Sequence, residues 1–160
     1  MSEVAVVIPL EPMRVGDTYV MNDIPLHLTV LSNARLGGPA SRFVGEVQRV
    51  AADFQPLVAR ALSFELFGPN ADIPVTEVTV GQDLRRLHAA LIGAVRRQGG
   101  GAVEPAYWEA GYRAHVTKTQ RGSGVEPGAE IQLERLALLD CTEPTRRVIW
   151  AASLGSPAVA

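Results

Sequence analysis

The sequence is poor in cysteine and has no long apolar run. Cys141 is its only cysteine, so neither an intramolecular disulfide nor a zinc site built on cysteines can form. No apolar stretch approaches the roughly 20 residues that a membrane-spanning helix needs. The first residues carry no basic stretch ahead of their apolar segment, as a signal peptide would. We therefore expect a cytoplasmic protein without a membrane anchor.

An excess of positive charge is also missing. The 15 Lys and Arg residues are outnumbered by 17 Asp and Glu residues, which gives a formal net charge of -2. A broad basic surface for long or duplex nucleic acid is therefore excluded, because such binding needs many cations facing phosphates. A small anionic ligand held by a few groups remains compatible with this charge.

Composition and length favour one compact domain. Hydrophobic residues make up 47% of the 160 residues and charged residues 20%, as in ordinary globular proteins. A chain of this size can bury a core of its own but is short for two independent domains. We expect a single domain over residues 1–160, with a flexible tail over 155–160.

The amino-terminal half is expected to contain two strands and a helix. A β-branched run ended by proline predicts a strand over 4–10, and a second strand is expected over 26–31. Pro, Gly, Asp and Asn within 11–25 favour a loop or a short hairpin arm between them. Apolar residues at helical spacing predict a helix from residue 40 to about 60, ended or kinked near Pro56.

More strands and one further helix are expected in the rest of the chain. The runs over 61–67 and 75–80 can pair as a hairpin. Asp83 is expected to cap a helix that ends at the glycine run 99–101. Adjacent strands separated by single helices indicate an α+β fold with antiparallel sheets. The remaining expected elements are strands over 112–119, 131–139 and 146–152 and a glycine-rich turn over 122–128.

Two short segments share one pattern, a histidine followed two residues later by a threonine. The first pair is His27 and Thr29, and the second, about half the chain further on, is His115 and Thr117. Both pairs fall in predicted strands, where successive side chains point to opposite faces. Each pair therefore places its two polar side chains on one face, with apolar neighbours on the other.

These residue types suit phosphoester chemistry. A histidine of near-neutral pKa can take a proton from an attacking hydroxyl or water, and a second one can give a proton to the leaving oxygen. Threonine hydroxyls can hydrogen-bond the non-bridging oxygens and hold the phosphorus between the two rings. We therefore expect His27 and His115 to be catalytic and Thr29 and Thr117 to bind substrate, in a cleft where the two strands face each other.

Paired segments of this kind, His27-x-Thr29 and His115-x-Thr117, resemble the signatures of the two-histidine (2H) phosphoesterase superfamily, which includes 2'-5' RNA ligase-like proteins and cyclic phosphodiesterases. The resemblance implies a two-lobed α+β fold with a helix in each lobe, pseudo-twofold symmetry and a central groove lined by both motifs. It also implies that neither a metal nor a cofactor is used.

The resemblance further implies a substrate class. Members hydrolyse 2',3'-cyclic phosphates or cleave phosphodiesters through a neighbouring ribose hydroxyl. The expected substrates are therefore small nucleotides with 2',3'-cyclic phosphates, RNA ends, and 2'-5' or 3'-5' linkages. Some phage members degrade cyclic oligonucleotide immune signals, so these ligands are included by analogy.

Three residues near the second motif are further candidates for substrate binding. Arg113 shares the strand face of His115 by parity and could contact a phosphate, although a surface position is the alternative. Tyr112 and Trp108 precede the motif, where a ring could either stack on a base or pack in the core.

Other interpretations stay open. Either motif histidine, taken alone, fits a half-buried strand residue satisfied by a neighbour. His88, the third histidine, lies beside Arg85 and Arg86 on the second expected helix, which suggests a solvent-facing side chain and argues against a three-histidine zinc site. A non-catalytic module that binds a nucleotide or an RNA end would keep the same groove, although binding alone does not need two proton-transfer groups. A metal-dependent hydrolase is the third alternative.

Overall fold

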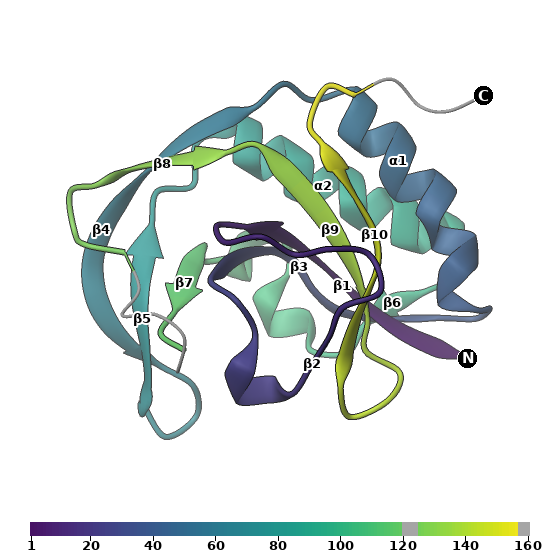
Figure 1. Cartoon of the computed structure of the whole chain (residues 1–160), viewed down its shortest axis with the longest axis horizontal. Helices are drawn as coiled ribbons and strands as arrows, with labels where there is room; N and C mark the ends of the chain where they lie inside the picture. Colours follow the sequence, from purple (N-terminus) through teal and green to yellow (C-terminus); the bar gives the residue numbers. More distant parts are fainter. Residues whose placement is uncertain (120–124, 157–160) are drawn as a thin grey trace.

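The computed structural model describes residues 1–119 and 125–156. Within these ranges, ten β-strands and two α-helices are joined by loops and short 3-10 turns (Figure 1). The turn expected over 122–128 and the tail expected over 155–160 lie partly outside the described residues. In the part of the chain that is described, no helix is both long enough and apolar enough to cross a membrane.

One half of the sheet is built around its first strand. β1 (Ser2–Pro9) pairs antiparallel with β3 (His27–Leu36) on one side and with β9 (Arg135–Asp140) on the other. The order of this half is β2–β10–β9–β1–β3, where β2 is Thr18–Tyr19 and β10 is Arg146–Ser153. The last two strands of the chain, β9 and β10, pair antiparallel.

The first strands agree with the expectations from sequence. The strands predicted over 4–10 and 26–31 are β1 and β3, although β3 continues to Leu36. The segment between them contains the short strand β2, which pairs with β10, and the 3-10 turn η1 (Met21–Asp23). The segment is therefore mainly loop, and its short strand pairs with the distant β10 instead of forming a hairpin arm with its neighbours in sequence.

The other half continues the same sheet. β3 meets β7 where Leu28 lies opposite Val116, and the order then runs β7–β5–β4–β8. β4 and β5 form the expected hairpin, β8 lies on the far side of β4, and the short β6 pairs with β3. The strands are β7 (His115–Thr117), β5 (Ile73–Val78), β4 (Leu57–Phe67), β8 (Glu130–Leu133) and β6 (Gly101–Ala102).

The single strand expected over 131–139 is two strands in the structure. Residues before Glu134 pair with β4 as β8, and residues after it pair with β1 and β10 as β9. The apolar residues on both sides of Glu134 and Arg135 do not reveal this change of partner, because both strands bury side chains in the same core. The sheet is consequently curled, and Figure 1 shows β8 running directly into β9 across its top.

Two helices cover one face of the sheet. α1 (Val44–Ala52) follows the 3-10 turn η2 (Ala40–Phe43) and packs mainly against β9 and β10. α2 (Gln82–Arg97) packs mainly against β3, and the two helices pack against each other (Figure 1). The predicted α+β class with antiparallel pairing is confirmed.

The first helix is shorter than predicted. α1 ends at Ala52, and the chain enters β4 at Leu57 directly after Pro56. From there buried and exposed residues alternate, with Ala59 buried and Arg60 exposed, which is the period of a strand. The apolar residues of this segment are compatible with helical spacing only because the run is too short to separate the two periods.

The ends of the second helix are set by glycines. The N-cap of α2 is Gly81, and Asp83, expected as the cap, lies in the first turn instead. The predicted carboxyl end is confirmed at Gly99, whose φ of +70° is a left-handed conformation that glycine adopts at little cost.

The main core lies between the helices and the sheet. Leu28 of β3 and Val116 of β7 are fully buried there against Leu87 and Leu91 of α2 and their neighbours. A smaller cluster that includes Val7 fills part of the opposite face. Because the helix side is filled by apolar side chains, alternate residues of β3 and β7 must project from the other face.

Truncation of the core should be costly. Leu91→Ala, at a side chain with 0% exposure, is expected to lower the free energy of unfolding by about 2–5 kcal/mol. Leu66→Ala, at 61% exposure, should change it by less than about 0.5 kcal/mol. Urea denaturation measures both values, and equal effects of the two substitutions would contradict this placement of the core.

Candidate active site

The two His-x-Thr segments lie on adjacent strands and share one face. His27 and Thr29 belong to β3, and His115 and Thr117 belong to β7. The residue between each pair is fully buried on the helix side, so alternation turns the four motif side chains to the opposite face. All four are partly buried. The shared polar face predicted from the sequence is therefore present.

Strand register brings the two motifs together. Their central residues, Leu28 and Val116, lie opposite each other in an antiparallel pair. Each histidine consequently falls beside the threonine of the other motif. Directly opposed side chains start about 5 Å apart and diagonal ones about 7–8 Å apart, and the two histidines lie on a diagonal. This spacing leaves room for one phosphate group between the rings.

The backbone holds both imidazoles in the same way. His27 Nδ1 lies 2.8 Å from the carbonyl oxygen of Pro25, and His115 Nδ1 lies 2.8 Å from that of Arg113. A carbonyl oxygen can only accept a hydrogen bond, so Nδ1 carries the proton and donates in each ring. Nε2 is then the nitrogen that can accept or release a proton at the site. Both carbonyls belong to the residue two positions before the histidine.

Burial governs the protonation of His27. Loss of hydration lowers its pKa, and the hydrogen bond to the Pro25 carbonyl opposes this effect. The two rings are close enough to interact, because the charge of His115 lowers the pKa of His27 further. His27 is therefore predominantly neutral at pH 7, as a general base must be.

The protonation of His115 depends on more neighbours. Burial is the largest influence and holds the pKa of His115 below its ordinary value, although the hydrogen bond to the Arg113 carbonyl and the negative charge of Glu77 raise it. The guanidinium charge of Arg113 acts in the lowering direction. The two histidines thus share a backbone arrangement but differ in charge environment, because a carboxylate lies beside His115.

Glu77 is a site residue that sequence reasoning missed. It lies directly opposite His115 in the β5–β7 pair and shares its face. Arg113 donates from Nε and Nη2 to the two carboxylate oxygens of Glu77, at 3.0 and 2.8 Å. Arg113 itself precedes β7 and is exposed, as the alternative from sequence allowed, and its guanidinium reaches Glu77. Only strand pairing reveals Glu77, since no local pattern in β5 distinguishes it.

Phe67 is a second residue that was missed. Its ring contacts the His115 ring edge-on, with centroids 4.9 Å apart and planes at 63°. The Arg113 guanidinium lies over the Phe67 ring, 4.4 Å from its centroid. The aromatic ring limits the positions open to the imidazole and contributes to its dehydration.

Trp108 and Tyr112 lie on the helix side of the sheet. Both are buried in the main core, and the Trp108 indole donates to Ser32 Oγ at 3.0 Å. The Tyr112 hydroxyl donates to the Thr29 carbonyl at 2.9 Å. Of the two alternatives for these rings, core packing is therefore the one present, and the expectation that they contact substrate is corrected.

His88 is buried rather than solvent-facing. Its exposure is 2%, and its ring accepts and donates hydrogen bonds within the core. The neighbouring Arg85 suggested an exposed side chain, yet His88 follows Leu84 by four positions and precedes Leu91 by three, which is the spacing of one helix face. That spacing is the sequence signal that indicates its orientation.

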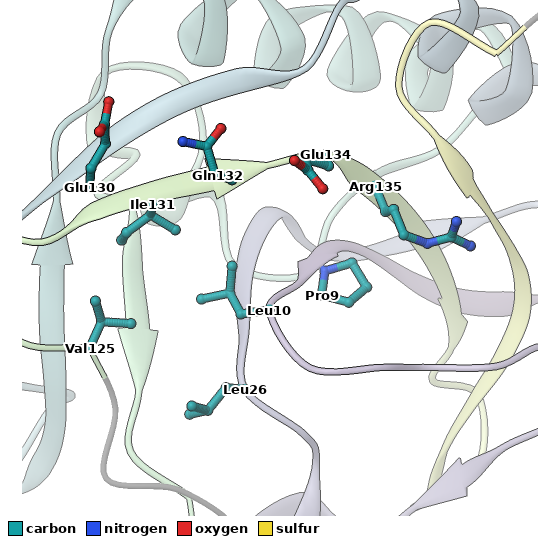
Figure 2. A pocket seen from close by; sticks show the side chains of 9 residues that line it. All are labelled: Pro9, Leu10, Leu26, Val125, Glu130, Ile131, Gln132, Glu134 and Arg135. Atoms are coloured by element: carbon teal, nitrogen blue, oxygen red, sulfur yellow. The ribbon is translucent and has the colours of Figure 1, made fainter.

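A cavity of about 480 Å³ lies between β8 and β9 on one side and the segments around Leu10, Leu26 and Val125 on the other (Figure 2). None of the four motif residues lines it. The arrangement of the histidines, rather than this cavity, marks the candidate site. The lining residues are Pro9, Leu10, Leu26, Val125, Glu130, Ile131, Gln132, Glu134 and Arg135.

A metal centre would need several ligating side chains close together. Across residues 1–119 and 125–156, no group of three or more His, Cys, Asp and Glu side chains is arranged to hold a metal ion.

Comparison with known proteins gives matches in structure. No family model and no curated protein sequence matches the chain. Escherichia coli LigT in complex with 3'-AMP is similar over 97% of this chain and 99% of its own, with a TM-score of 0.58 and 13% identity. A structure solved as a phosphoesterase matches over 96% of this chain and 98% of its own, with a TM-score of 0.56 and 13% identity.

A third match comes from a thermophile. A Thermus thermophilus protein is 18% identical, with a TM-score of 0.54 over 96% of this chain and 98% of its own. At these identities the comparisons establish the fold and leave the chemistry to be argued from the residues.

The charges beside His115 can be tested in the free protein. Glu77→Gln should lower the pKa of His115, because it removes the charge that favours the imidazolium, and Arg113→Gln should raise it. NMR titration of the imidazole signals measures the pKa, and His27 serves as the internal comparison. Shifts of His115 in the same direction in both variants would contradict this electrostatic assignment.

Proposed function

We propose that this chain, which has the fold of the LigT-like 2H phosphoesterases, is a metal-independent phosphodiesterase acting on small nucleotides or RNA ends. One observation carries the proposal. Two imidazoles on adjacent strands each donate Nδ1–H to a backbone carbonyl and thereby keep Nε2 for proton transfer on a common face. Binding alone would not require two groups prepared in this way.

The two histidines divide the proton transfers between them. His27, whose neighbours disfavour the charged form, acts as general base and takes a proton from the attacking water or ribose hydroxyl. His115, beside the Glu77 carboxylate, acts as general acid and gives its Nε2 proton to the leaving oxygen. In the reverse direction the roles exchange. The pH dependence of the rate would then reflect both rings, so its apparent pKa values belong to the pair and not to one histidine.

The remaining polar groups bind the phosphate. Thr29 and Thr117 occupy the second diagonal of the motif face, where their hydroxyls can donate to non-bridging oxygens. Arg113 uses Nε and Nη2 on Glu77 and keeps Nη1 for a phosphate oxygen. These donors stabilise the charge that grows on the non-bridging oxygens as the leaving oxygen departs.

The substrate class follows from this chemistry. A 2',3'-cyclic phosphate places attacked phosphorus and leaving ribose oxygen within one compact group, which suits a site with one phosphate-sized space. E. coli LigT has been solved with 3'-AMP, and 3'-AMP is a phosphate monoester on the ribose of the kind that such hydrolysis yields. A net charge of -2 favours short ligands over long nucleic acid. Short 2'-5' or 3'-5' linkages and cyclic oligonucleotides belong to the same class.

Turnover in the presence of a chelator tests the proposal. The panel is 2',3'-cyclic nucleotides, 2'-5' and 3'-5' dinucleotides and cyclic oligonucleotides, assayed with wild type, His27→Ala and His115→Ala. We expect hydrolysis of at least one member, with kcat reduced about 10²- to 10⁴-fold in each variant. Leu66→Ala, at an exposed site outside the motifs, is the control and should retain full activity.

Other outcomes separate the alternatives. Absence of turnover by wild type, together with ligand affinity that falls in both histidine variants, would identify a non-catalytic binding module. Activity abolished by the chelator and restored by a divalent cation would identify a metal-dependent hydrolase. Hydrolysis unaffected by either substitution would refute the two-histidine mechanism.

A further inference from the structure

The first motif strand contains an irregularity next to its threonine. In the β1–β3 pair Val7 lies opposite Thr29 and Val6 lies opposite Leu31, so Val30 has no partner on β1. Such a bulge leaves its extra residue outside the ladder and bends the strand. On its other side, β3 pairs with β7 only at Leu28 and Val116 among the described positions. Ladder hydrogen bonds therefore constrain this part of the site weakly.

His88 forms hydrogen bonds with two backbone groups, one of them at this bulge. Its Nδ1 lies 2.7 Å from the Val30 carbonyl oxygen, and its Nε2 lies 2.9 Å from the backbone nitrogen of Glu109. The carbonyl can only accept and the backbone N–H can only donate, so the ring must be neutral with its proton on Nδ1. Burial favours that neutral form. His88 is thus committed to two backbone contacts and has no nitrogen left for substrate.

Tyr112 joins the same bulge to the second motif. Its ring stacks on His88, with centroids 4.1 Å apart and planes at 10°, and its hydroxyl donates to the Thr29 carbonyl at 2.9 Å. Burial raises the pKa of this hydroxyl, which keeps it a donor. Tyr112 lies three residues before His115. The stacked pair therefore connects the first motif strand with the segment that leads into the second.

The segment that His88 contacts has an unusual backbone. Glu109 has a φ of +58°, a left-handed conformation that is uncommon outside glycine. Its N–H donates to His88 Nε2, and its carbonyl accepts the N–H of Tyr112 at 3.1 Å. Such a conformation persists where the surroundings determine it. His88 therefore also fixes the turn from which Tyr112 and the second motif begin.

We propose that His88 and Tyr112 are positioning residues that hold the two motif strands in register from behind the sheet. They contact no reacting atom, and their effect reaches the substrate through Thr29 and His115. The role in catalysis rests on the proposed phosphodiesterase function, whereas the role in strand alignment does not.

Three substitutions separate the contacts. Tyr112→Phe removes the bond to Thr29 and keeps the ring stack. His88→Leu removes both backbone bonds, and His88→Gln supplies a donor and an acceptor that can replace them. Val95→Ala, in the same helix but beside Gly100 and Leu36 at the far end of β3, is the control for general loss of stability. Tyr112→Phe is the least disruptive variant and keeps the test valid if His88→Leu fails to fold.

Two readouts are needed. Amide hydrogen exchange in the free protein should be about threefold to tenfold faster at Thr29 and Val116 in Tyr112→Phe than in wild type. Steady-state kinetics should show kcat reduced about tenfold to a hundredfold, since Thr29 and His115 are displaced from the geometry that the reaction needs. His88→Gln should recover most of the activity that His88→Leu loses, and Val95→Ala should keep the wild-type kcat where it is folded.

The outcomes are distinguishable. Exchange and kcat in Tyr112→Phe equal to those in Val95→Ala would overturn the positioning role and leave the pair as ordinary core. Faster local exchange in a protein whose wild type shows no turnover on any substrate would support the alignment role and remove the phosphodiesterase proposal instead.

Discussion

The short antiparallel contact between β3 and β7 is the constraint on which the site depends. The motifs lie about half the chain apart, and this pairing places both imidazoles on one face. Leu28 and Val116 fix the register because both are fully buried against the helices. A slip of one residue would bury the polar side chains and expose the apolar ones, at a cost that burial makes prohibitive.

Two similar half-sites become different through their surroundings. Each histidine donates Nδ1–H to the carbonyl two residues earlier, so the local backbone prepares both in the same way. The difference arises from β5, which brings Glu77 beside His115 and ties Arg113 to it. In the proposed mechanism one base and one acid act at the same moment, and this unequal electrostatic environment is the feature that distinguishes the two rings.

Much of this arrangement could be predicted from local patterns. Strand alternation is enough to place His27 with Thr29 and His115 with Thr117, and element order indicates the α+β class. Neither pattern reports which strands pair, so Glu77 and Phe67 were missed although they contact His115 or lie opposite it. The same limit explains the strand over 131–139, which changes partner at Glu134. The orientation of His88 was misjudged from its neighbours Arg85 and Arg86, since helical period and not adjacency decides burial.

The most direct test is a crystal structure with a nucleoside vanadate, which mimics the five-coordinate phosphorus of the transition state. We predict that the vanadium lies between Nε2 of His27 and Nε2 of His115, with the Thr29 and Thr117 hydroxyls on the equatorial oxygens. A nucleoside vanadate bound instead in the cavity beside Leu26 and Ile131, with both histidine Nε2 atoms free, would contradict the assignment of the site.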